Sequence, residues 1–262
     1  GVGGPTGEPI ELRPSLRALF DAARADLEAA GAIVVETDFP LVSNYEGDRP
    51  GAPTIRTRGL VSEEFLHREI VDLSAWAWDD FLRATGHPGL ASVDGAAIFP
   101  HPEGALPDRY TGFDDDIAEY PAHVREHPVA SFTEIPALAE GLHGLEETRR
   151  RDLEEWMDAN GFAAVVFPTL SDVAPADADV NEASADIAWR NGVWVATGNL
   201  AIRHCGVPTV TVPLGTMPDI GMPSGLTFAG RAYDDAALLA MAAAFEALRP
   251  RRTVPPRTPA LG

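Results

Sequence analysis

Apolar residues recur at helical and strand periods along the chain, in an order that predicts alternating helices and strands. After Pro14 the apolar positions are spaced by three or four residues up to Gly31, which predicts a helix with one buried face. The run from Ala32 to Phe39 follows directly and predicts a strand. A strand that follows a helix after a glycine stop is the second half of a β-α-β unit, so the pattern indicates an α/β fold with a sheet covered by helices.

The middle of the chain holds two long helical patterns with an irregular stretch between them. The first begins at Ser62, whose hydroxyl suits the start of a helix, and ends near Gly86. From 87 to 130 the density of Gly, Pro and His predicts an irregular insertion or lid. Ser131 to Glu134 has the spacing of a capping box, and a glycine-interrupted helical pattern runs from there to Gly161.

The C-terminal part of the chain returns to a pattern of strands and helices. Strands are predicted at 163–167, 209–212 and 225–229, and helices at 184–204 and 236–248. The Arg- and Pro-rich residues 249–262 are predicted to form a loose tail. The folded unit is therefore expected to span residues 1–248.

Composition and charge exclude several classes of partner. With 262 residues, of which 45% are hydrophobic, the chain is long enough to bury a large core. Its net charge of −20 repels nucleic acid and anionic membranes, so small molecules or other proteins are the expected partners. No apolar run is long enough to cross a membrane. A single cysteine fits a reducing compartment, so we expect a cytoplasmic protein.

The residue types present also restrict the chemistry. The chain contains no lysine, so all 20 basic residues are arginines and any mechanism within the chain must do without a lysine base. Cys205 beside His204 suggests a thiol nucleophile, but adjacent residues on a helix point in different directions. A buried and inert cysteine is favoured.

Two further patterns are typical of cofactor sites, and both are incomplete. The glycines between Gly1 and Gly7 lack the Lys-Ser/Thr ending of a phosphate-binding loop. His123 and His127 are four residues apart, as metal ligands on one helix face would be, but Pro121 and Pro128 flank them and argue against a regular helix. Neither a metal nor another cofactor is therefore expected.

The chain resembles the C-terminal end of amidase-signature enzymes in the order and spacing of its Gly- and Pro-containing motifs. The helix and strand at 14–39 are similar to the segment that follows the signature region of that family. The resemblance implies that residues 1–248 are the C-terminal portion of an amidase-signature domain, with a mixed β-sheet covered by helices on both faces. The matching motifs are Pro168-Thr169, Gly206-Val207-Pro208, Val212-Pro213-Leu214-Gly215, Gly221-Met222-Pro223-Ser224-Gly225-Leu226 and Gly230-Arg231.

The resemblance implies hydrolysis of a carboxamide C–N bond by a serine nucleophile. In that family the proton of the nucleophilic serine is passed through a second serine to a lysine base. Backbone amides form the oxyanion hole. This chain has no Ser-Ser pair and no lysine, and the family's order would place these residues before Gly1. No catalytic residue is assigned, and the chain alone is expected to be inactive. The alternative is a non-catalytic binding or assembly domain that pairs with a separate catalytic chain.

Five residues are candidates for binding a small-molecule amide substrate. Thr169 ends a predicted strand, although it could instead cap the following turn. Trp189 and Trp194 lie on the predicted helix 184–204, where a place in the core is the alternative. The family often has Asn three residues before the glycine of its Gly-x-Pro motif; here that position is Arg203, and Asn199 lies one helical turn earlier. Arg203 could meet a substrate carboxylate through its planar guanidinium, or simply lie on the surface.

Overall fold

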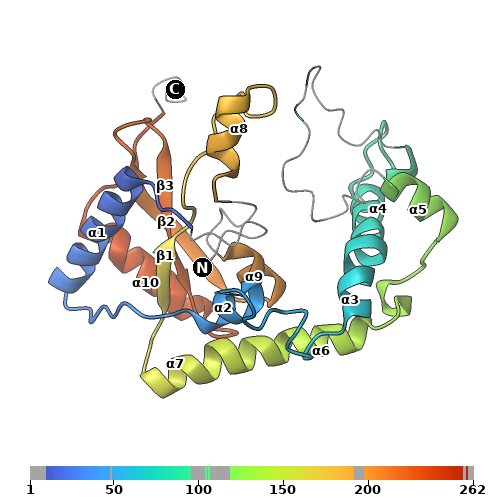
Figure 1. The fold of residues 1–262 in the computed structure, drawn as a ribbon, viewed down its shortest axis with the longest axis horizontal. Coiled ribbons are helices and arrows are strands. Elements are labelled where there is room, and N and C mark those ends of the chain that lie inside the picture. Colours follow the sequence, from blue (N-terminus) through green and yellow to red (C-terminus); the bar gives the residue numbers. More distant parts are fainter. Residues whose placement is uncertain are drawn as a thin grey trace.

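A small antiparallel sheet lies at the centre of the larger part of the molecule (Figure 1). The computed structural model describes residues 10–47, 49–95, 104, 106, 119–191, 198–255 and 258. Within these residues the sheet has three strands, β1 (Val165–Pro168), β2 (Thr209–Thr216) and β3 (Pro223–Ala229), in the order β1-β3-β2. Both pairings are antiparallel, and Val165 and Thr209 both lie opposite Ala229. The strands predicted from the C-terminal motifs are confirmed.

Two helices cover one face of this sheet. They are α1 (Pro14–Ala29), which confirms the predicted first helix, and α10 (Asp235–Leu248). Side chains alternate along a strand, so Leu226 and Phe228 of β3 point to this face together. We call the cluster the α10 core; its buried members are Leu16, Ala23, Val212, Leu214, Met217, Leu226, Phe228, Leu238, Ala242 and Phe245.

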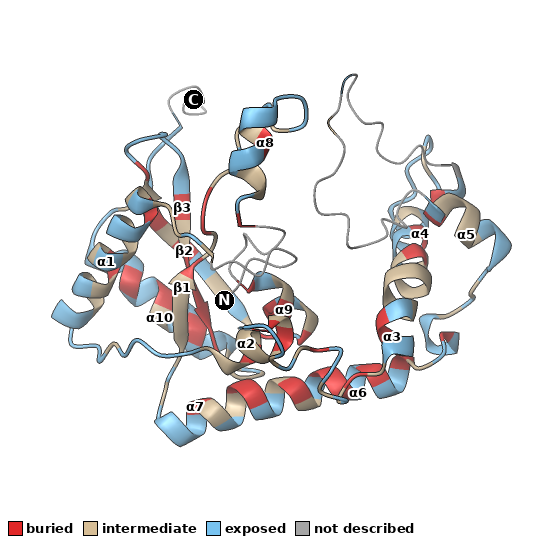
Figure 2. Cartoon of the chain, viewed as in Figure 1, coloured by how far each residue is buried: buried red, intermediate tan, exposed pale blue. Residues whose placement is uncertain are grey.

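The other face of the sheet is covered by three helical elements. They are α2 (Pro40–Glu46), α9 (Asn199–His204) and a long rod made of α6 (Leu138–Arg149), a π-helical turn (Arg150–Glu154) and α7 (Glu155–Asn160). Figure 2 shows the buried residues along the inner side of this rod. We call this cluster the α6 core; it includes Leu41, Leu145, Leu153, Met157, Ile202 and Ala229. The α/β fold class with helices on both faces is thus confirmed.

The stretch from Ala32 to Phe39 differs from the prediction, because it is not a strand. It has no regular secondary structure and pairs with no strand in the described part of the chain. A strand pattern needs a neighbouring strand to form a ladder, and the residues that the structure describes provide none beside it. For this reason the observed sheet is antiparallel rather than mixed.

A helical arm, formed by residues 62–95 and 119–134, extends from the α6 end of the rod (Figure 1). It contains α3 (Glu63–Arg68), a π-helical turn (Glu69–Leu73), α4 (Ser74–Thr85) and α5 (Tyr120–Glu126), with short 3₁₀ turns at Val93–Gly95 and Phe132–Glu134. The predicted helix from Ser62 to Gly86 is confirmed, and the Ser62 hydroxyl accepts a hydrogen bond from the Phe65 amide at 3.2 Å. The arm core consists of Ala75, Val93 and Tyr120.

Three other segments refine the predicted boundaries. Helix α5 forms despite Pro121, because proline is tolerated in the first turn of a helix. The apolar stretch 184–204 is divided into α8 (Glu182–Trp189) and α9, with 192–197 outside the described residues. In the predicted tail, Arg251 is held by Asp26 at 2.5 Å and lies over the Phe245 ring at 3.8 Å.

Candidate functional site

Thr169, the first sequence candidate, belongs to a row of hydroxyl groups that crosses the sheet. Its Oγ1 lies 2.8 Å from Thr227 Oγ1 on β3, which in turn lies 2.9 Å from Thr211 Oγ1 on β2. We call these three residues the threonine row. Thr227 alternates with Leu226 and Phe228, so the row lies on the sheet face opposite the α10 core. Its outer end at Thr211 is exposed and can bond to another molecule.

Gly225 makes this row possible. A Cβ at this position would lie 2.7 Å from Thr169 Oγ1 and 2.6 Å from the Thr211 methyl group. The Thr169 amide also donates to the Gly225 carbonyl at 3.0 Å. The glycine of the Ser224-Gly225-Leu226 motif lies within β3 and is required for close approach across the strands.

A polar clamp fixes the loop that follows Thr169. We define it as Arg13, Ser171, Asp172, Arg190 and Asn191. The Asp172 carboxylate, only 5% exposed, accepts from Arg13 at 2.8 Å and also pairs with Arg190. The side-chain amide of Asn191 donates to Ser171 Oγ at 3.0 Å and to the Glu11 carbonyl at 2.9 Å. Its oxygen accepts a hydrogen bond from the Glu11 backbone amide at 2.8 Å. The clamp joins the loop after β1 to the end of α8 and to the segment before α1.

The clamp brings the end of α8 close to the loop that carries Thr169. Trp189 is the last residue of α8, directly before Arg190 and Asn191, and is half-buried. Thr169 and Trp189 therefore lie on segments that are tied together by buried polar contacts. Trp194 lies outside the described residues.

Asn199 and Arg203 are placed differently. Both are exposed on α9, whose N-terminus packs against α2 so closely that a Cβ on Gly198 would lie 2.5 Å from Val42. Helix α9 leads into the beginning of β2, whereas Thr169 follows the end of β1, and the register puts these at opposite ends of the sheet. The structure thus associates Thr169 with Trp189, and it separates Thr169 from Arg203.

His204, which the sequence did not indicate as a site residue, connects three elements. Its Nδ1 accepts from the Tyr45 hydroxyl at 2.7 Å, and its Nε2 donates to Glu69 at 2.6 Å. These bonds satisfy both ring nitrogens and link α9 to α2 and to the π-helical turn of the arm. The neighbouring Cys205 is buried, as predicted, and burial raises the pKa of its thiol to about 12, which disfavours the reactive thiolate.

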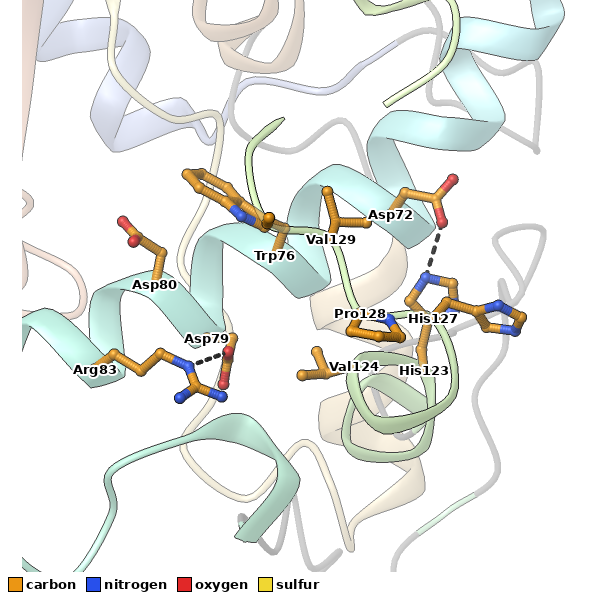
Figure 3. A pocket seen from close by; sticks show the side chains of 11 residues that line it. Asp72, Trp76, Asp79, Asp80, Arg83, His123, Val124, His127, Pro128 and Val129 are labelled. Carbon is orange, nitrogen blue, oxygen red and sulfur yellow. Dashed lines mark hydrogen bonds and ion pairs between the residues drawn. The ribbon is translucent and has the colours of Figure 1, made fainter. Parts of the chain in front are cut away.

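A separate cavity of about 240 Å³ lies in the arm between α4 and α5 (Figure 3). The Nε2 of His123 is hydrogen-bonded to the Asp72 carboxylate at 2.8 Å, and the ring centroids of His123 and His127 are 5.0 Å apart. The Arg83 guanidinium donates to the Asp79 carboxylate at 2.5 Å. Among the residues that the structure describes, no group of three or more His, Cys, Asp or Glu side chains could hold a metal ion.

None of the described helices is long and apolar enough to cross a membrane.

The fold is similar to part of known hydrolase structures. Over 91% of its residues the chain matches 42% of the chain of 6-aminohexanoate cyclic dimer hydrolase complexed with substrate, with a TM-score of 0.53 and 18% identity. A second structure of that hydrolase gives the same TM-score and coverages, with 16% identity. A bacterial aryl acylamidase belonging to the amidase-signature enzymes gives a TM-score of 0.47 and 15% identity over 92% of this chain and 41% of that one.

At these identities the likeness shows the fold alone. No family model matches the chain, and no curated protein matches it. The α/β arrangement nevertheless matches part of the fold of 6-aminohexanoate cyclic dimer hydrolase. The chain spans less than half the length of the hydrolase structures that it matches.

Proposed function

We propose that this chain is the C-terminal part of an amidase that hydrolyses a carboxamide C–N bond by serine acyl-enzyme chemistry. The observation that carries the proposal is the match of 91% of this chain to only 42% of a hydrolase chain, together with the family's closing motifs in order. The chain has no lysine and no Ser-Ser pair. The nucleophile and its base therefore belong to a part of the enzyme outside these residues, upstream of Gly1.

In this proposal the chain supplies part of the substrate-binding surface. Thr169 and Trp189 lie on segments that the polar clamp holds together, which supports a shared role in contacting the acyl group. Trp194, Asn199 and Arg203 complete the candidate set. A half-buried threonine hydroxyl and an indole ring can orient a small amide without taking part in proton transfer. Orientation of this kind lowers the barrier for a separate nucleophile.

The test is to assay the purified 262-residue chain and a version extended upstream through the region expected to contain the serines and lysine. Aryl and aliphatic amides are the substrates, and release of the amine is the measurement. We expect no turnover by the chain alone and turnover on the order of 1 s⁻¹ or more by the extended protein. Amide hydrolysis by the 262-residue chain itself would contradict the assignment of catalysis to other residues.

A further inference from the structure

The threonine row has a buried centre and two ends that are less buried. Thr227, at the centre, is only 5% exposed, and its Oγ1 lies 2.8 Å from Thr169 Oγ1 and 2.9 Å from Thr211 Oγ1. Within the described residues, these two hydroxyl groups are its hydrogen-bond partners. Thr169 is half-buried and Thr211 is exposed, so each end has room for a further hydrogen bond.

A hydroxyl group carries one proton, so the row can be hydrogen-bonded in two directions. In the first, Thr227 donates to Thr169, whose own proton is left to point out of the row. In the second, Thr227 donates to Thr211, so Thr169 donates inward and offers a lone pair outward. The buried Thr227 hydroxyl donates one bond and accepts one in both directions, and it therefore stays satisfied whichever role Thr169 takes.

The oxygen atom of Thr169 is held in place from several sides. The Thr169 amide donates to the Gly225 carbonyl at 3.0 Å, and two residues further on the polar clamp holds Ser171 through Asn191 at 3.0 Å. The β-branched side chain of threonine has few rotamers. Rotation of the hydroxyl proton about the Cβ–Oγ1 bond is the freedom that remains, and the bond to Thr227 limits it.

We propose that Thr227 is a positioning residue that orients the Thr169 hydroxyl group for a hydrogen bond to the amide substrate. This inference rests on the proposed function. A carbonyl oxygen of the substrate selects the first direction of the row, and an N–H group selects the second. Reversal costs little, because Thr211 at the other end is exposed to water, which both donates and accepts. Thr227 acts through Thr169 and does not itself contact the substrate.

Steady-state kinetics of the upstream-extended enzyme on one aryl amide test this role. Thr227→Val keeps the shape of the side chain and removes its hydroxyl group. We expect it to raise KM about threefold with kcat little changed, because the Thr169 hydroxyl must then be ordered when substrate binds. Thr227→Ser keeps the hydroxyl group and should leave KM at the value of the unmodified enzyme. A purely structural defect would instead reduce the amount of folded enzyme, which lowers the apparent kcat without changing KM.

A double-mutant cycle shows whether Thr227 acts through Thr169. Thr169→Val is expected to raise KM about fivefold, and the double variant should give the same rise, since no hydroxyl group is left for Thr227 to orient. Independent effects would multiply to about fifteenfold and contradict the inference. Thr209→Val is the matched control, because Thr209 is exposed, lies two residues before Thr211 on the same face of β2, and is outside the row. Its KM should equal that of the unmodified enzyme.

The two ways in which this inference can fail are distinguishable. If the extended protein hydrolyses no amide, both the proposed function and the role of Thr227 are overturned. If it hydrolyses amides and Thr227→Val leaves KM unchanged, the proposed function stands and the positioning role alone is overturned. An equal rise in KM for Thr227→Val and Thr209→Val also overturns the role, because the effect would then not depend on the row.

Discussion

At the scale of single residues, Thr169 is the candidate whose surroundings the structure defines most fully. Thr169→Val keeps the shape of the side chain and removes the hydrogen bond to Thr227. In the catalytically complete enzyme we expect KM for the amide to rise about fivefold with kcat little changed, because a lost hydrogen bond to substrate is worth roughly 1 kcal/mol. The measurement is steady-state kinetics on one aryl amide.

A matched control is available for this variant. Thr253→Val also removes a threonine–threonine hydrogen bond, to Thr216 at 2.9 Å, but at an exposed position away from Thr169. Its kinetics should equal those of the unmodified enzyme. If Thr169→Val changes only the thermal stability and leaves KM unaltered, then Thr169 serves the sheet and does not contact substrate.

Sequence could predict only part of the residue-level site. Thr169 was found because it ends a strand, which is a local signal. Its partners Thr227 and Thr211 come from other strands, and the clamp joins Arg13 to Asp172 across 159 positions. His204 is similar, since Tyr45 and Glu69 lie far away in sequence. Such contacts depend on tertiary packing, and no periodicity in one sequence specifies them.

At the scale of elements, helix α6 depends on two glycines that a helix would normally avoid. A Cβ on Gly144 would lie 2.0 Å from the Leu60 carbonyl oxygen, and one on Gly141 would lie 1.9 Å from the Phe65 ring. The glycines interrupt the helical pattern in the sequence, but in the structure they let the arm and the preceding loop approach the rod closely.

Gly144→Ala should therefore destabilise the protein. Alanine favours a helix by about 1 kcal/mol over glycine, but the clash is with backbone and cannot be relieved by rotating a side chain, so a net loss of about 1–3 kcal/mol is expected. Urea unfolding measures it. His143→Ala, an exposed change on the same helix, is the control and should stay within about 0.5 kcal/mol. Equal midpoints for the two variants would show that the rod can move away from Leu60.

Elements with a strong local pattern were predictable, and those that depend on a partner were not. Helix α1 follows from its apolar spacing, and β2 follows from its β-branched residues. The pattern at Ala32–Phe39 is just as strong, yet the described chain offers no neighbouring strand. Helix α5 was not predicted, because Pro121 and Pro128 argue against a regular helix between them, whereas Pro121 lies in the first turn, where proline is tolerated.

At the scale of the whole molecule, the cores on the two faces of the sheet share one strand, whereas the arm core is separate. Phe228 belongs to the α10 core and its neighbour Ala229 to the α6 core, so β3 cannot unfold without disrupting both. Among the described residues the arm core has three buried members, and Tyr120 is one of them and also donates a 2.6 Å hydrogen bond to the Ile70 carbonyl. Small, poorly buried units open at lower free energy than the rest of a protein.

Two substitutions should separate these units. Phe245→Ala in the α10 core is expected to cost about 3–5 kcal/mol and to accelerate amide exchange in α10 and in α7 alike, by more than about 100-fold for amides that exchange through global unfolding. Tyr120→Ala should accelerate exchange in α4 and α5 while leaving β3 unchanged. Hydrogen exchange followed by mass spectrometry reads all of these elements in one experiment. Faster exchange of β3 in the Tyr120 variant would instead show that the arm and the sheet unfold as one cooperative unit.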